Sequence, residues 1–146
     1  MDIKQDLARL NALGYRVTRQ RRLVLEVIRA NPCLQNVDDI FTQCRGRDES
    51  ISYPTIYRTL DMLVEAGMAR RTHFQGKNWY EGVMSSHHHH FVCTECGATV
   101  ALAVCPLDFL KEDLRAAQFE VHEHQFELLG ICKDCQSNQP KGGVLL

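Results

Sequence analysis

Two Cys-x-x-Cys motifs place the tightest limit on how this chain can fold. They are Cys93/Cys96 and Cys132/Cys135, with 35 residues between them. Two paired thiolate loops match a closed tetrahedral zinc site. The alternative, a redox motif, is disfavoured because two pairs are present and neither opens a helix in a βαβ context. We therefore predict a structural zinc ion, which can contribute about 10–16 kcal/mol of apparent binding energy to a small domain.

Four consecutive histidines, His87–His90, end two residues before the first motif. On an extended segment, alternate side chains point to opposite faces. His87 and His89 should therefore face one way, and His88 and His90 should face the other way. One tetrapeptide can thus contribute ligands to two metal sites. The alternative is a solvated loop with weak, adventitious metal affinity. Residues that folding could bring to the two sites are Cys33, His73, Glu81, Cys105, Asp108, His122 and His124.

The bulk composition indicates a soluble protein. The chain has 146 residues, of which 45% are hydrophobic and 24% charged. No apolar run approaches the ~20 residues needed to span a bilayer. The N-terminal segment lacks the apolar centre of a signal peptide, so we expect a cytoplasmic protein without a membrane partner. An odd number of cysteines, seven, in a reducing compartment favours metal thiolates over disulfides.

Charge is divided unevenly along the chain. Residues 1–80 carry 13 basic and 9 acidic side chains, whereas residues 81–146 carry 4 and 9. A basic half followed by an acidic half rich in Cys and His suggests a DNA-binding module and a ligand-sensing module. The alternative is ordinary surface variation, and charge alone does not decide between them.

Helical periodicity and end signals predict four helices in the first 67 residues. Gly14 should end the first helix, and Thr18 should cap the second helix. The third helix covers about Val37–Cys44. The fourth helix is capped by Ser52 and ends at Gly67.

After the fourth helix the spacing of apolar residues changes from that of a helix to that of strands. Met68–His73 and Asn78–Val83 are predicted to be two strands joined at residues 75–77. Helices followed by such a hairpin make a winged helix-turn-helix. In that arrangement the last helix enters the major groove of double-stranded DNA.

Side chains suited to DNA contact gather on the fourth helix and ahead of the second. Arg can pair with guanine, and Tyr or Thr can meet a thymine methyl group or a phosphate. The alternative is that Tyr57 packs in the core and Arg58 is a solvated charge. The hairpin and a basic cluster at the start of the second helix favour DNA binding; the cluster is Arg16, Arg19, Arg21 and Arg22. The predicted contact residues are Arg16, Arg19, Tyr53, Thr55, Tyr57 and Arg58.

The second half is predicted to mix strands and helix. Phe91–Cys93 and Thr99–Val104 are short strands that flank the first cysteine pair. Pro106 starts a helix that runs through about Ala117. Phe119–Leu129 is predicted to be a long strand that leads to the second cysteine pair.

These motifs together resemble the ferric uptake regulator (Fur) family of bacterial metal-sensing repressors, over about residues 5–136. The resemblance is carried by Thr18-Arg-Gln-Arg21, Pro54-Thr-Ile-Tyr-Arg58, Gly67, Tyr80-Glu81, His87–His90 and both cysteine pairs. It implies an α+β fold with an N-terminal winged helix-turn-helix domain and a C-terminal α/β dimerisation domain containing structural zinc. The corresponding segments are 1–83, a hinge at 84–86, 87–136, and a tail, 137–146, that we expect to be disordered.

The resemblance also implies a partner. A homodimer would bind an A/T-rich palindromic operator in double-stranded DNA, and a regulatory metal at the hinge would switch binding on. Tyr57 and Arg58 match recognition-helix contacts of the family. Arg16 matches a basic residue that reaches an A/T-rich minor groove.

The metal ligands of the family are present in this chain for one site and only partly present for another. One site is complete, with His87, His89, an acidic residue at Asp108, and His124 as its match on the long strand. The hinge site is incomplete.

At the hinge, Glu81, His88 and His90 fit, and His73 on the wing could supply a fourth ligand. The upstream histidine of iron and peroxide sensors is missing, and Ala101 replaces an acidic ligand. Four nitrogen and oxygen ligands suit zinc better than ferrous iron. The run of four histidines is also similar to the zinc uptake regulator (Zur) branch. Regulatory Zn(II) is therefore favoured, with Fe(II) sensing as the alternative and a peroxide or manganese sensor after it.

Two other classes of function are alternatives. A zinc hydrolase would need a bound water at an open His/Glu site, but the chain lacks H-E-x-x-H and the deaminase signature. A metal buffer or redox module would use the thiols without binding an operator. We expect neither, and we expect no enzyme activity.

Overall fold

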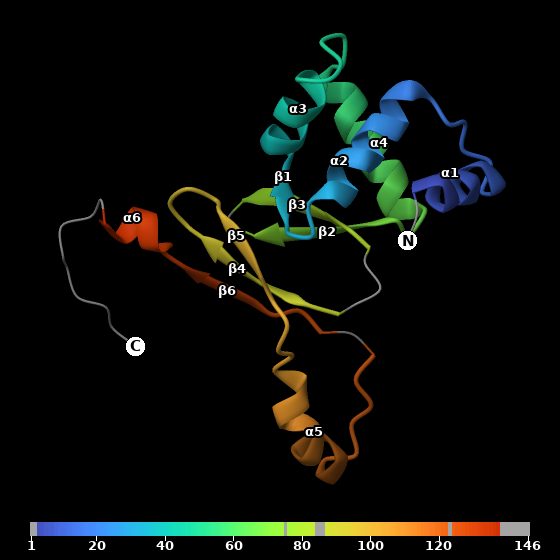
Figure 1. Cartoon of the computed structure of the whole chain (residues 1–146). Helices are drawn as coiled ribbons and strands as arrows, with labels where there is room; N and C mark the ends of the chain where they lie inside the picture. The colour runs from blue at the N-terminus through green and yellow to red at the C-terminus, as the bar shows by residue number, and fades with distance from the viewer. Residues whose placement is uncertain (1–2, 75, 84–86, 123, 138–146) are drawn as a thin grey trace. The chain divides into compact units, whose positions relative to one another are not determined.

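The computed structural model describes residues 3–74, 76–83, 87–122 and 124–137. The chain forms two compact units, Met1–Ser85 and Ser86–Leu146 (Figure 1). The predicted hinge, 84–86, and residues 138–146 of the predicted tail lie outside the described residues. Among the described residues, no helix is long and apolar enough to cross a membrane.

Four helices build the core of the first unit. They are α1 (Ile3–Ala12), α2 (Arg19–Ala30), α3 (Val37–Arg45) and α4 (Tyr53–Glu65). The Thr18 hydroxyl oxygen accepts a hydrogen bond from the Arg21 backbone N–H at 3.2 Å, as predicted for a helix cap. Ser52 precedes α4, but its hydroxyl contacts that of Thr55 at 3.0 Å instead of capping the backbone. The buried core includes Leu10, Val24, Leu25, Ile28, Ile40, Ile56, Leu60, Leu63 and Met68.

A three-stranded antiparallel sheet completes the first unit. Its order is β1–β3–β2, with β1 at Gln35–Asn36, β2 at Ala69–Phe74 and β3 at Lys77–Gly82. The hairpin β2–β3 is the predicted wing. The two-residue β1 was not predicted, because a segment this short carries no alternating pattern. Helices α2 to α4 followed by this hairpin form a winged helix-turn-helix.

A buried ion pair holds α1 against α2. The Nε of Arg29 lies 3.0 Å from a carboxylate oxygen of Asp6, and both side chains are largely buried. The Arg29 guanidinium also donates to the backbone carbonyl of Val83, just after β3. Gly82 allows this approach, since an added Cβ would lie 3.2 Å from Cδ of Arg29. One arginine therefore connects two helices and the end of the wing.

The second unit contains a mixed sheet. Strand β4 (His89–Cys93) lies between β5 (Thr99–Leu102), which is antiparallel to it, and β6 (Glu127–Gly130), which is parallel to it. Helix α5 (Leu107–Ala116) falls between β5 and β6 in the chain, and α6 (Lys133–Ser137) follows β6. The helices and the two sheets agree with the predicted α+β class.

The predicted long strand Phe119–Leu129 is wrong. Only its last three residues belong to β6, and the described residues from 119 to 126 have no regular structure. The apolar side chains are present, but Phe119 is 71% exposed, and in the described part of the chain no strand pairs with this segment. An alternating pattern becomes a strand only where a neighbouring strand can pair with it.

The second unit exposes many large apolar side chains. All ten residues of α5 are exposed or half-buried, although the helix is amphipathic. Exposed fractions reach 78% for Phe109 and 63% for Val104. The others are Val100, Leu110, Phe119, Val121, Leu128 and Leu129. A single chain thus leaves a large apolar area uncovered in this unit.

Candidate metal centres and DNA-binding surface

The four predicted zinc cysteines come together in the second unit. The sulfur atoms of Cys93, Cys96, Cys132 and Cys135 all lie within 4.8 Å of one another. The sulfurs of Cys96 and Cys132 are 3.7 Å apart, too far for a disulfide bond of about 2.05 Å. A tetrahedral ion with Zn–S bonds of about 2.3 Å needs sulfurs about 3.8 Å apart. The four thiols therefore fit a structural zinc ion.

The sheet positions both cysteine pairs. The parallel register of β4 and β6 sets Cys93 beside Gly130, two residues before Cys132. The backbone N–H of Cys132 then donates to the Cys93 sulfur at 3.3 Å. Gly130 is needed here because an added Cβ would lie only 2.9 Å from the Phe91 ring. The short strand β6 thus does the positioning that the predicted long strand was expected to do.

Electrostatics in the four-cysteine group also favours a cation. Backbone N–H groups of Cys132 and Cys96 donate to Cys93 and lower the pKa of its thiol to about 6. The neighbouring Cys132 and Cys96 thiols raise the pKa of Cys135 well above its usual value. Four thiolates so close together repel one another unless a positive ion lies between them.

A second group of donors forms around the histidine run. The Nε2 of His87 lies 3.0 Å from the Nε2 atoms of both His89 and His124, and the latter two are 3.3 Å apart. The sulfur of Cys105 lies 3.2 Å from the His124 Nε2. His89 hydrogen-bonds the Phe126 carbonyl through Nδ1 at 3.1 Å, which leaves its Nε2 free of a proton. Burial lowers the pKa of His89 and so keeps its imidazole neutral, the form that binds metals.

The fourth predicted member of this site, Asp108, is not in the group. Its carboxylate accepts from the Lys111 ammonium at 2.5 Å, and this contact lowers its pKa. Cys105 lies among the imidazoles instead. The sequence prediction named Cys105 only as a possible ligand, because the resemblance pointed to an acidic residue.

The other face of the run carries His88 and His90. Their ring centroids are 4.8 Å apart, with His90 buried on β4. In the first unit, Glu81 is a buried carboxylate on β3.

The wing does not support His73 as a ligand beside Glu81. Glu81 pairs with Arg70, three residues before His73 on β2. Three residues span about 10 Å and an odd step changes the face of the strand. His73 is exposed and bonds Asn78 at 2.9 Å. The prediction that His73 shares a site with Glu81 is therefore wrong.

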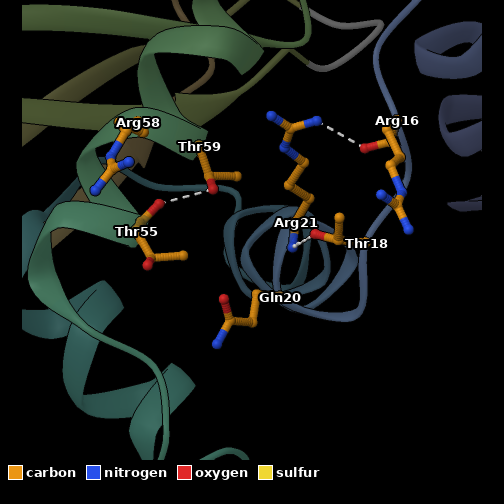
Figure 2. A pocket seen from close by; sticks show the side chains of 7 residues that line it. All are labelled: Arg16, Thr18, Gln20, Arg21, Thr55, Arg58 and Thr59. Atoms are coloured by element: carbon orange, nitrogen blue, oxygen red, sulfur yellow. Dashed lines mark hydrogen bonds between the residues drawn. The ribbon is translucent and has the colours of Figure 1, made fainter.

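A polar hollow of about 350 Å³ separates the start of α2 from α4 in the first unit. Figure 2 shows Arg58, Thr55 and Thr59 of α4 on one side, and the residues in and just before the first turn of α2 on the other. The guanidinium of Arg21 donates to the Arg16 carbonyl at 2.7 Å. The lining is basic and hydroxylated, which suits a phosphate backbone. Its residues are Arg16, Thr18, Gln20, Arg21, Thr55, Arg58 and Thr59.

The remaining predicted DNA contacts lie outside this hollow. Tyr53 stacks on Phe41, with ring centroids 3.8 Å apart, and its hydroxyl donates to Asp38 at 2.9 Å. Tyr57 is 44% exposed, so it does not pack in the core. The Arg19 side chain is 82% exposed and lies 3.8 Å from Asp48. Gln20 was missed by sequence reasoning, because a single polar residue in a helix carries no distinguishing signal.

Comparison with known proteins places the chain in a family. The Ferric uptake regulator family matches residues 12–129. The ferric uptake regulation protein of Brucella abortus biovar 1 (strain 9-941) is 32% identical over 138 residues, covering 93% of this chain and 94% of that protein. The peroxide operon regulator of Bacillus subtilis (strain 168) is 26% identical over 139 residues, covering 94% and 96%.

The fold agrees with that placement. A structure of the Vibrio cholerae ferric uptake regulator is 28% identical in sequence with a TM-score of 0.77, covering 90% of this chain and 100% of that one. The winged-helix domain is thus followed by a dimerisation domain with a zinc-suited cysteine cluster, as the sequence predicted. The chain belongs to the ferric uptake regulator family of metal-responsive transcription regulators.

Proposed function

We propose that the chain is a zinc-sensing, metal-dependent repressor that binds DNA in the cytoplasm and controls genes of metal uptake. The observation that carries the choice of zinc is the donor chemistry of the second unit. Imidazole nitrogen and thiolate sulfur make up both groups of donors within it. These ligands suit zinc, whereas manganese prefers carboxylate, carbonyl and water oxygens.

An iron-sensing repressor of the same family is the second candidate. The 32% identity to the Brucella ferric uptake regulation protein favours it. A peroxide or manganese sensor comes third, supported by the 26% identity to the Bacillus peroxide operon regulator. The identities are too similar to separate these branches, and the donor chemistry of the second unit is what supports zinc.

The proposed regulatory ligands are Glu81, His88 and His90. The two imidazoles share one face of the run, and the carboxylate is buried at a position seven residues before His88. A bound ion would tie the end of the wing to the start of β4 across the predicted hinge. Such a link would restrict the positions that the DNA-binding unit can take. A coupling free energy of about 1–3 kcal/mol suffices for a five- to 150-fold change in affinity.

The proposed DNA-binding surface combines the hollow with the exposed front of α4. Arg16, Arg21 and Arg58 supply charge for phosphates or guanine, and Tyr57 is exposed for base contact. Tyr53 and Arg19, which have partners within the chain, are weaker members of this set. An A/T-rich palindromic operator would present one half-site to each of two such surfaces.

A homodimer is the partner state that the second unit supports. The uncovered apolar side chains of α5 and β6 include Phe109 and Leu129, exposed by 78% and 51%. A second copy that covers them would remove this area from water. Each Å² of apolar surface buried in this way stabilises the dimer by about 25 cal/mol. The dimer would also provide the two-fold symmetry that a palindrome requires.

The His88→Ala variant tests the regulatory site. A duplex is first selected from a randomised pool with the zinc-loaded protein, and binding is measured by gel shift with zinc and with chelator. We expect His88→Ala to keep its dimer and its structural zinc but to lose metal-dependent binding.

His73→Ala serves as the matched control, because the register of the wing separates His73 from Glu81. It should bind the duplex as the unaltered protein does. Equal zinc dependence in His88→Ala and in the unaltered protein would contradict the proposed site.

A further inference from the structure

We propose that Cys105, and not Asp108, completes the metal site of His87, His89 and His124, and that its thiolate makes the site select zinc over manganese and ferrous iron. This ligand set adds detail to the proposed function. It depends on that function only because the chain must bind metal. It concerns one chain and needs neither DNA nor the hinge.

The site is built into the fold. His89 is 4% exposed on the central strand β4, with its Nε2 aimed at those of His87 and His124. Its Nδ1 bond to the Phe126 carbonyl makes that Nε2 a proton acceptor only. Three imidazole nitrogens that converge in this way cannot all be satisfied by hydrogen bonds to one another. A cation among them satisfies all three at once.

Cys105 lies where a fourth ligand is needed. Its sulfur is 3.2 Å from the His124 Nε2, and all four donor atoms lie within 4.8 Å of one another. A tetrahedral zinc ion with Zn–N bonds of about 2.0–2.1 Å requires nitrogens about 3.3 Å apart. The nitrogen pairs here are separated by 3.0, 3.0 and 3.3 Å. One ion can therefore contact the three imidazoles and the thiolate together.

Asp108 has a different role in this chain. Its side chain is 57% exposed and is held by Lys111 one turn further along α5. Cys105 comes before the helix, in the segment that joins β5 to α5. The site therefore gains a soft sulfur donor where an acidic residue would supply a hard oxygen.

That exchange changes which metals the site prefers. Thiolate and imidazole favour zinc, whereas manganese is held best by oxygen ligands. The four protein donors also make a closed tetrahedral shell, as in sites that retain zinc. Binding converts the Cys105 thiol to a thiolate and releases its proton to solvent.

Cobalt(II) titration tests the assignment directly. The probe is Co(II) added to protein that retains one structural zinc ion per chain. Thiolate ligation gives a near-ultraviolet charge-transfer band, and tetrahedral Co(II) gives intense visible bands. We expect both bands in the unaltered protein. His124→Ala should remove the charge-transfer band, which shows that this band does not come from the four-cysteine site; the visible bands are compared in a His88→Ala background, so that the proposed regulatory site does not contribute to them.

Four variants separate the alternatives. Cys105→Ser should lose the charge-transfer band and bind Co(II) at least about tenfold more weakly. Asp108→Asn and the thiol control Cys33→Ser should keep both. Cys105→Asp should bind Mn(II) more tightly relative to Zn(II) than the unaltered protein does.

Two results would overturn the inference. One is a Cys105→Ser spectrum that retains the charge-transfer band, and the other is loss of binding in Asp108→Asn. Neither result bears on DNA binding. A protein with the expected cobalt spectrum but no zinc-dependent DNA affinity would refute the proposed function alone.

Discussion

Arg58 on α4 is the single side chain whose role in DNA binding can be isolated most cleanly. Its guanidinium lines the hollow, and its Nε donates to the Pro54 carbonyl at 3.3 Å, a contact that costs little to break. Arg58→Ala should therefore leave the fold intact. We expect it to weaken binding of the selected duplex by about 1–3 kcal/mol. Fluorescence anisotropy across a range of salt concentrations measures the effect.

The salt dependence shows what Arg58 contacts. A phosphate contact predicts that the salt slope falls by about 1 in Arg58→Ala and is restored in Arg58→Lys. A bidentate guanine contact predicts that the lysine variant loses sequence preference instead. Arg115→Ala is the control, since it removes one exposed positive charge on α5, outside the proposed DNA-binding surface. Equal affinity of Arg58→Ala and the unaltered protein would remove Arg58 from the interface.

The histidine run shows what can be inferred at single positions. Alternation along an extended chain predicts the separation of His87 and His89 from His88 and His90, and the ring contacts agree with it. Alternation does not say which residues complete each set. Cys105 and His124 come from segments whose paths depend on α5 and on an irregular stretch. Sequence spacing contains no information about such paths.

At the scale of elements, the ion pair of Asp6 and Arg29 makes a stability prediction. Arg29→Met would leave the Asp6 carboxylate, which is 1% exposed, without its cation. We expect a loss of about 3–5 kcal/mol in the free energy of unfolding, measured with urea. The variant also removes the bond from Arg29 to the Val83 carbonyl, so it should loosen the end of the wing.

Arg22→Met is the matched control on the same helix. Arg22 pairs with Glu26 at 2.8 Å, but its side chain is 57% exposed. Solvent screens such a pair, and its loss should cost at most about 1 kcal/mol. If both variants unfold at the same urea concentration, the buried pair is not the connection between α1 and α2 that the structure indicates.

Elements with local end signals were predicted well from sequence. The second helix begins next to the Thr18 cap. Gly67, which has a φ of +66°, lies just after the end of α4. The wing followed from its two alternating runs. The strands β1 and β6 were not predicted correctly, because both are short and exist only through pairing with β3 and β4. Pairing partners depend on tertiary contacts, which local pattern does not encode.

At the scale of the whole molecule, the two units differ in how they are stabilised. The first has a continuous apolar core shared by four helices and the wing. The second buries few apolar side chains, among them Val92 and Cys93, and exposes many on α5 and β6. We expect structural zinc and a second copy of the chain to supply what its small core lacks.

In the proposed function, zinc is the metal that switches DNA binding on. The most direct measurement titrates the purified dimer, at constant duplex concentration, with buffered free Zn(II), Fe(II) and Mn(II) under anaerobic conditions. Per-site metal content is determined in parallel. We expect binding to saturate at a lower free concentration of Zn(II) than of Fe(II) or Mn(II). Activation by Fe(II) at the lower free concentration, with zinc confined to the four-cysteine site, would contradict it.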